Sequence, residues 1–277
     1  MKHKPAALTA LLLSALFPAA LSSAADAETY EPTLYFRTEA AENVTSLPTG
    51  RLYLNRNKFP DGAKITAGAY YLDEPKATNM LYAKWQCDSD SVRLTNLTDP
   101  ITAAGACPYS KWTSPSAINL KFIEEDNYMA VSYPSTVSSP LAVTGESTDS
   151  YPLACFDIEL PADIPSGRYE VYFRQGDMGD ISSASYANPI RDIRPSGDHA
   201  PSLFIGVSDR DLGDVNNSGK LEATDASKVL VAYTFLSSGD PSGLTIEEEL
   251  AAEVNGDGLI TASDASQILI MYADSSN

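Results

Sequence analysis

The stretch GDVNNSGKLEATDASKVL, residues 213–230, places oxygen-bearing side chains at alternate positions, then a glycine, and then the start of an apolar helical pattern. The chain repeats this arrangement at residues 252–269 as AEVNGDGLITASDASQIL. Calcium takes roughly six to eight oxygen ligands, and a loop of about 12 residues supplies them from alternate positions, with glycine at position 6 for the bend. The duplication therefore predicts two calcium loops rather than a single acidic turn.

Each predicted loop begins at an acidic residue and ends at an aspartate, and at position 7 the ligand is a main-chain carbonyl oxygen. The position-6 glycines are Gly219 and Gly258, and the apolar residues at position 8 are expected to face inward, where two such loops pair. A small helical unit of this kind gains much of its stability from the ions, so we expect metal removal to unfold it. The predicted ligands of the two ions are Asp214, Asn216, Ser218, Lys220, Glu222 and Asp225 in the first loop, and Glu253, Asn255, Asp257, Leu259, Thr261 and Asp264 in the second.

The residues around these loops are expected to be helical. Apolar side chains fall at helical spacing over residues 225–236 and again over residues 264–272. Between them, Thr245 followed three residues later by Glu248 is a capping box, which predicts a short helix ending near residue 252. The sequence therefore predicts a small all-α unit over residues 209–277.

The paired loops, each followed by DAS and an apolar helix, resemble a dockerin, the calcium-loaded module by which cellulosomal proteins of anaerobic bacteria bind cohesins on a scaffoldin. The resemblance covers residues 209–277 and implies a cohesin partner. It places the contact at Ala223, Thr224, Ala262 and Ser263 and on the exposed parts of the two helices, although these four residues are also ordinary at a helix start. Because the two repeats are alike there, we hypothesise binding in two orientations related by half a turn.

Two loop residues depart from the dockerin pattern. Ser218 stands where the family usually has Asp at position 5, which removes a charge from the first site. Glu253 stands where the family usually has Asp at position 1, which adds a methylene to a tight ligand sphere. Each departure is expected to weaken its site.

Residues 28–208 are rich in Tyr, Val, Thr and Ile and are broken repeatedly by Pro, Gly, Asn and Asp. Apolar residues alternate with others in several short runs, which is typical of half-buried strands. Many short strands without a long helix predict an all-β antiparallel sandwich, so the expected fold class is multidomain. The runs are ITAGAYYL (65–72), LYAKWQC (81–87), FDIEL (156–160), RYEVYF (168–173) and SLFIGV (202–207).

These segments, with a P-x-G-x-Y turn at residues 165–169, weakly resemble cohesin-like sandwiches, which implies an adaptor scaffoldin that receives one dockerin protein and docks into another. A carbohydrate-binding module is the alternative, since sugar rings stack on exposed aromatic side chains, although in a sandwich such residues usually fill the core. The aromatic candidates are Tyr70, Tyr82, Trp85, Tyr109, Trp112 and Tyr172.

We expect no enzymatic activity. Beyond the leader the only histidine is His199, so a Ser/His or Cys/His arrangement would depend on that one residue. A small glycoside hydrolase remains an alternative, with Glu124, Glu125, Asp157 and Glu159 as carboxylate candidates, but no hydrolase signature surrounds them. The net charge of −18 disfavours nucleic acid and anionic membranes as partners.

Residues 1–27 read as a secretory signal peptide, with Lys2 and Lys4 before an apolar run over residues 6–17. No later stretch is long and apolar enough to span a bilayer, so we expect a soluble, secreted, cellulosome-associated protein. LPTG at residues 47–50 lacks the intervening residue of a wall-sorting signal and is interpreted as a turn. Of the three cysteines, a Cys87–Cys107 disulfide is slightly favoured, with three buried thiols as the alternative.

Overall fold

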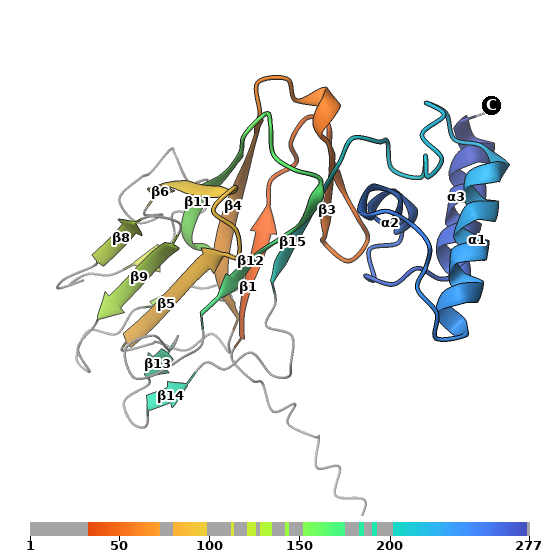
Figure 1. The fold of residues 1–277 in the computed structure, drawn as a ribbon. Helices are drawn as coiled ribbons and strands as arrows, with labels where there is room; N and C mark the ends of the chain where they lie inside the picture. The colour runs from red at the N-terminus through yellow and green to blue at the C-terminus, as the bar shows by residue number, and fades with distance from the viewer. Residues whose placement is uncertain are drawn as a thin grey trace, which may run out of the picture. The chain divides into compact units, whose positions relative to one another are not determined.

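A computed structural model describes residues 33–72, 80–98, 112–113, 121–125, 128–134, 142–143, 152–174, 183–185, 190–192 and 202–275. Within these ranges, strands occupy the chain up to residue 208 and helices follow (Figure 1). A short 3-10 helix, Arg56–Lys58, follows β3. The strands are β1 (Thr33–Thr38), β2 (Val44–Ser46), β3 (Leu52–Asn55), β4 (Ala63–Leu72), β5 (Met80–Cys87), β6 (Arg93–Thr98), β7 (Trp112–Thr113), β8 (Lys121–Glu125), β9 (Tyr128–Pro134), β10 (Ala142–Val143), β11 (Pro152–Leu160), β12 (Gly167–Phe173), β13 (Ser183–Ser185), β14 (Ile190–Asp192) and β15 (Leu203–Ser208).

The strands form two main sheets. One has the order β1-β4-β11-β6, and the other has the order β14-β13-β5-β12-β15-β3-β2, with β9 pairing both β5 and β8; β10 pairs β7 separately. Nearly all described pairs are antiparallel, as the sequence predicts, but β15 runs parallel to β3, with Ile205 opposite Leu52. Period-two patterning could not reveal this pair, because alternation fixes the faces of a strand and leaves its direction open.

Aromatic side chains from both sheets fill the space between them. Trp85 of β5 and Phe173 of β12 come from one sheet, and Phe36 of β1 and Phe156 of β11 come from the other. The Trp85 and Phe156 rings lie 5.4 Å apart, and both side chains are buried. This shared core confirms the predicted sandwich.

Two predicted turns are present. The Tyr169 hydroxyl donates a hydrogen bond to the carbonyl oxygen of Pro165 at 2.7 Å, which closes the P-x-G-x-Y turn between β11 and β12. Residues 47–51 form the turn between β2 and β3, in which the Gly50 amide donates to the Leu47 carbonyl at 2.9 Å and Gly50 has a φ of 85°. The interpretation of LPTG as a turn is confirmed.

Three helices follow the strands: α1 (Ala223–Ser237), α2 (Ile246–Ala252) and α3 (Ala262–Ser275) (Figure 1). The predicted capping box opens α2, since the Thr245 hydroxyl accepts from the Glu248 amide at 3.3 Å and the Glu248 carboxylate accepts from the Thr245 amide at 3.1 Å. Val229 of α1 and Ile268 of α3 are fully buried and belong to one apolar cluster that the two helices share. Among the described residues no helix is both long and apolar enough to cross a membrane.

The cysteine prediction is wrong. Cys87 is a free, buried thiol at the end of β5, whereas Cys155 of β11 is disulfide-bonded. Cys107 lies outside the described residues. Sequence spacing could not decide the pairing, because sheet topology sets which cysteines approach one another.

Candidate calcium loops

The first loop, residues 214–225, folds around its opening aspartate. The Asp214 carboxylate accepts hydrogen bonds from the amides of Ser218 and Gly219, at 2.9 and 2.8 Å. The Asn216 side-chain oxygen also accepts from the Ser218 amide at 2.9 Å. Gly219 has a φ of 77°, which is the sharp bend expected at position 6. The predicted ligands at positions 1, 3 and 5 are therefore brought together.

The second loop, residues 253–264, has the same plan. The Glu253 carboxylate accepts from the Gly258 amide at 3.0 Å, and the Asn255 side-chain oxygen accepts from the Asp257 amide at 2.8 Å. Gly258 has a φ of 84°. The longer Glu253 side chain thus reaches the position-6 amide as Asp214 does in the first loop.

The aspartates at position 12 close both loops. Asp225 and Asp264 are fully buried, each in the first turn of its helix. One carboxylate oxygen of each accepts from the amide at position 9 of its own loop, Glu222 or Thr261, at 2.9 Å. The other oxygen reaches back to amides near the loop start, at 3.0 Å for Asn216 and 3.1 Å for Val254. Each aspartate therefore ties the beginning of its loop to the following helix.

The donor chemistry of both loops fits calcium, a hard cation that takes oxygen ligands. The remaining predicted ligands are the position-7 carbonyl oxygens and the side chains at position 9. Among the described residues, no three Asp, Glu, His or Cys side chains lie together so that they alone could hold a metal ion. Half of each predicted ligand set is amide, hydroxyl or main-chain oxygen instead. The assignment of individual ligands stays a prediction.

Burial raises the pKa of Glu253, whereas the Gly258 amide and the positive charge of Arg51 lower it. Arg51 belongs to the turn between β2 and β3, so a residue of the sandwich acts on the second loop. No local sequence pattern predicts this contact directly. One signal for it was present: Gly256 stands at position 4 of the second loop, where the first loop has Asn217.

The helices after the loops present apolar side chains outward. Leu230, Val231 and Tyr233 of α1 are 43, 55 and 38% exposed. Their equivalents in α3, Leu269, Ile270 and Tyr272, are 44, 53 and 39% exposed. The four predicted contact residues, Ala223, Thr224, Ala262 and Ser263, are exposed as well. The two repeats thus expose matching surfaces.

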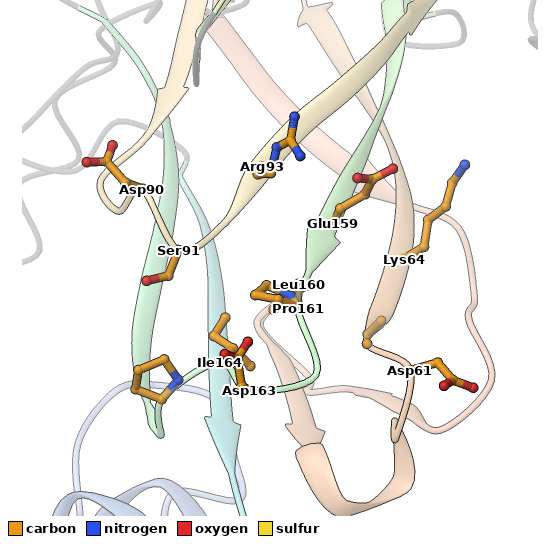
Figure 2. A pocket seen from close by; sticks show the side chains of 13 residues that line it. Asp61, Lys64, Asp90, Ser91, Arg93, Glu159, Leu160, Pro161, Asp163 and Ile164 are labelled. Atoms are coloured by element: carbon orange, nitrogen blue, oxygen red, sulfur yellow. The ribbon is translucent and has the colours of Figure 1, made fainter.

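A charged pocket lies elsewhere, on the sandwich, and one of the carboxylate candidates lines it. It has a volume of about 600 Å³ and lies between the end of β11 and the starts of β4 and β6 (Figure 2). Its lining carries Glu159, Lys64 and Arg93 and no aromatic side chain. A sugar ring would therefore find no stacking surface there.

The other candidates for catalysis or sugar binding are mostly engaged in the fold. The buried Asp157 carboxylate accepts from Thr66 and Asn96, at 2.9 and 2.8 Å, and pairs with Lys64 at 2.6 Å. Trp85 and Tyr70 are buried, so neither presents its ring to solvent. Tyr172 is partly buried and lies against Gln86. The side chains of Tyr82, Tyr109, Trp112, Glu124 and Glu125, and His199, lie outside the described residues.

Two loops with a positive-φ glycine at position 6 and a buried aspartate opening the following helix define a paired calcium-loop module of the EF-hand kind. Residues 212–272 match the family model of the dockerin type I domain. The C-terminal part of the chain is therefore a dockerin type I domain, as the sequence predicts, and such domains bind calcium.

Solved structures similar to this chain include cohesins and cohesin–dockerin complexes. The seventh ScaB type I cohesin of Pseudobacteroides cellulosolvens is 11% identical, with a TM-score of 0.38, over 63% of this chain and 92% of that one. A type III cohesin module of the ScaE scaffoldin of Ruminococcus flavefaciens is 14% identical, with a TM-score of 0.37, over 65 and 88%. The Coh-OlpA-Doc918 complex of Clostridium thermocellum is 12% identical, with a TM-score of 0.32, over 63 and 99%. No curated protein matches the chain.

Proposed function

We propose that this protein is a secreted, non-catalytic cellulosome subunit that docks onto a scaffoldin cohesin through its dockerin and presents its β-sandwich to a further partner. The observation that carries the proposal is the duplicated loop and helix with matching exposed surfaces. A monomeric soluble protein rarely leaves a contiguous apolar patch open unless a partner covers it. Calcium at both loops would fix the two helices beside one another and so form this surface.

The residues to test are those that occupy equivalent positions on the apolar surfaces of the two repeats. Leu230 and Leu269 occupy the same position in the two repeats and are similarly exposed. An aspartate at either position would place a charge in the desolvated centre of an interface, which is costly. The double variant Leu230→Asp/Leu269→Asp is therefore expected to lose cohesin binding while still binding calcium.

Calorimetry with purified scaffoldin cohesins, in calcium and in chelator, tests the docking proposal. Binding by the wild type in calcium, none in chelator, and none by the double variant is the expected pattern. Ile246→Asp is the matched control, because Ile246 is 38% exposed but opens α2 rather than lying on the surface of α1 and α3. Unchanged cohesin binding by the double variant would overturn the role assigned to this surface.

The two-orientation hypothesis predicts a specific difference between single and double variants. Each single substitution is expected to leave one orientation intact and to cost little affinity, whereas the double variant loses both. Loss of binding by one single variant alone would show that only one orientation is used.

For the sandwich, we propose an adaptor role, in which it receives a dockerin-bearing protein and so supports polysaccharide degradation by the complex. The shared aromatic core and the closed Pro165–Tyr169 turn support a cohesin-like sandwich, and the burial of Trp85 and Tyr70 weighs against sugar stacking. The full chain carrying Leu230→Asp/Leu269→Asp, immobilised, isolates this activity because its own dockerin is disabled. Calcium-dependent retention of dockerin proteins supports the proposal, whereas retention of polysaccharide alone supports a carbohydrate-binding role.

A further inference from the structure

The second loop packs against the sandwich through the turn between β2 and β3 (residues 47–51). The Thr49 hydroxyl donates a hydrogen bond to the carbonyl oxygen of Gly256. A Cβ atom on Gly256 would lie 2.5 Å from the Thr49 hydroxyl oxygen and 2.8 Å from Cβ of Leu47. Because any side chain would collide there, this contact explains why position 4 is glycine in the second loop.

Apolar packing beside the loop supports the same contact. Leu250 of α2 is buried together with Leu47 and Tyr53 of the sandwich. At the edge of this cluster, Arg168 of β12 pairs with Glu249 of α2 at 3.6 Å. The apolar cluster therefore holds α2, and the loop that follows it, beside the sandwich, whereas the partly exposed Arg168–Glu249 pair adds little.

Arg51 places a positive charge directly on the second loop. A Cβ atom on Gly258 would lie 2.7 Å from Nη2 of Arg51, and the guanidinium carbon lies 4.5 Å from the centre of the Phe204 ring. Arg51 and Glu253 line the same small pocket. Among the described residues, Arg51 forms no salt bridge within 4.0 Å, so its charge is not neutralised by a direct ion pair.

Among the described residues, no cation packs on the first loop as Arg51 packs on the second, and the first loop's own Lys220 is exposed to solvent. A Cβ atom on Gly219 would meet nothing within 4 Å, and its neighbours Asn217 and Ser218 are exposed. Arg210 donates to the Val215 carbonyl in that loop, but its charge is shared with Glu248 at 3.5 Å and Asp209 at 3.7 Å. The two loops differ in their charged surroundings despite their similar sequences.

We propose that Arg51 is a built-in counter-cation of the second loop, which keeps that loop folded on the sandwich without calcium and lowers its affinity for the ion. Carboxylates gathered in an empty calcium loop repel one another, and a fixed cation beside them reduces that repulsion. The same cation repels an incoming divalent ion. The first loop, whose own Lys220 is exposed to solvent, has no such packed cation among the described residues and depends on calcium for its structure. The inference rests on the proposed calcium binding by both loops.

Hydrogen exchange of the full chain in chelator tests the first half of this proposal without any substitution. Amides of residues 253–264 are expected to exchange more slowly than those of residues 214–225, and added calcium is expected to slow mainly the latter. Equal exchange of the two loops in chelator overturns the proposal.

Three variants test whether the positive charge of Arg51 is responsible for this behaviour. Arg51→Gln is expected to speed exchange of the second loop in chelator to the level of the first, and to tighten calcium binding at that loop roughly five- to tenfold at low ionic strength. Arg51→Lys, which keeps the charge, is expected to retain most of the wild-type behaviour. Arg168→Gln removes a charge from the same interface, but its partner Glu249 is no loop ligand, so it is expected to change neither quantity.

Calorimetric calcium titrations of these proteins separate the possible failures. Two sites in the wild type, one of which tightens in Arg51→Gln alone, support the inference. Two sites that are unaffected by Arg51→Gln overturn the inference and leave the proposed calcium function standing. No calcium binding by the wild type overturns both.

Discussion

The ring of Phe36 lies parallel to that of Phe173, with their centroids 4.2 Å apart. The two residues belong to opposite sheets, so this stacked pair joins the layers of the sandwich. Phe173→Ala is expected to lower the free energy of unfolding by about 3 to 5 kcal/mol, because it removes a buried ring and leaves a cavity. Urea denaturation measures the change, with Phe173→Leu as a milder control. A loss below about 1 kcal/mol would contradict this account of the core.

The dockerin segment on its own, residues 209–277, lacks Arg51, so both loops are expected to need calcium for folding. Circular dichroism of this segment should show a gain of helix on calcium addition. The double variant Asp225→Ala/Asp264→Ala should abolish that gain, because both buried carboxylates that close the loops are lost. Asp274→Ala, at the exposed end of α3, is the control. Unchanged calcium titrations of the double variant would sink the assignment of position 12.

The difference between Asn217 and Gly256 gives a reciprocal pair of variants. Gly256→Asn copies the first repeat into the second and is expected to push the loop off Thr49, since its Cβ would collide with the hydroxyl. Asn217→Gly makes the opposite change in an exposed loop and is expected to leave the contact intact. Hydrogen exchange of residues 47–51 reports the outcome: only Gly256→Asn should raise it. Equal exchange in both variants would contradict the packing described for this loop.

Burial raises the pKa of the Cys87 thiol to about 12. At pH 8 the reactive thiolate is then roughly one ten-thousandth of the population, so iodoacetamide is expected to label the folded protein very slowly. Without reductant, denaturant should expose the Cys87 thiol to the reagent, whereas the disulfide-bonded Cys155 should stay unlabelled. Mass spectrometry counts the labels. Rapid labelling of Cys87 in the folded protein would show that the end of β5 opens.

Lys58 and Asn55 hydrogen-bond to the Asp211 carboxylate and hold its pKa below the usual value of 3.8. A carboxyl group with a lowered folded-state pKa stabilises the fold above the unfolded-state pKa, and this stability is lost as pH falls through the lowered value. Asp211→Asn should therefore lose less stability than the wild type as pH falls below about 4. The difference is expected to be only a few tenths of a kcal/mol, because exposed pairs are weak. Urea denaturation at several pH values measures it, and parallel pH curves would contradict the prediction.

Local sequence pattern predicted much of this molecule. Alternating apolar residues located β4, β5, β11, β12 and β15, and the duplicated loops located α1 and α3, because each pattern reports the geometry of its own element. Features that depend on distant partners were missed. The parallel pairing of β15 with β3 and the bonding of Cys155 follow from topology, and Thr49 and Gly256 lie 207 residues apart. In the sequence, the sign of the contact between Thr49 and Gly256 is the glycine at position 4 of the second loop, where the first loop has Asn217.

The attachment of the second loop alone to the sandwich breaks the internal symmetry of the dockerin. Its two outward surfaces match, but among the described residues only the second of its two calcium loops contacts the sandwich. A cohesin that accepted the dockerin in both orientations would therefore receive the sandwich facing two opposite directions. One polypeptide would then place its cargo on either side of the same attachment point, without any change in its own fold.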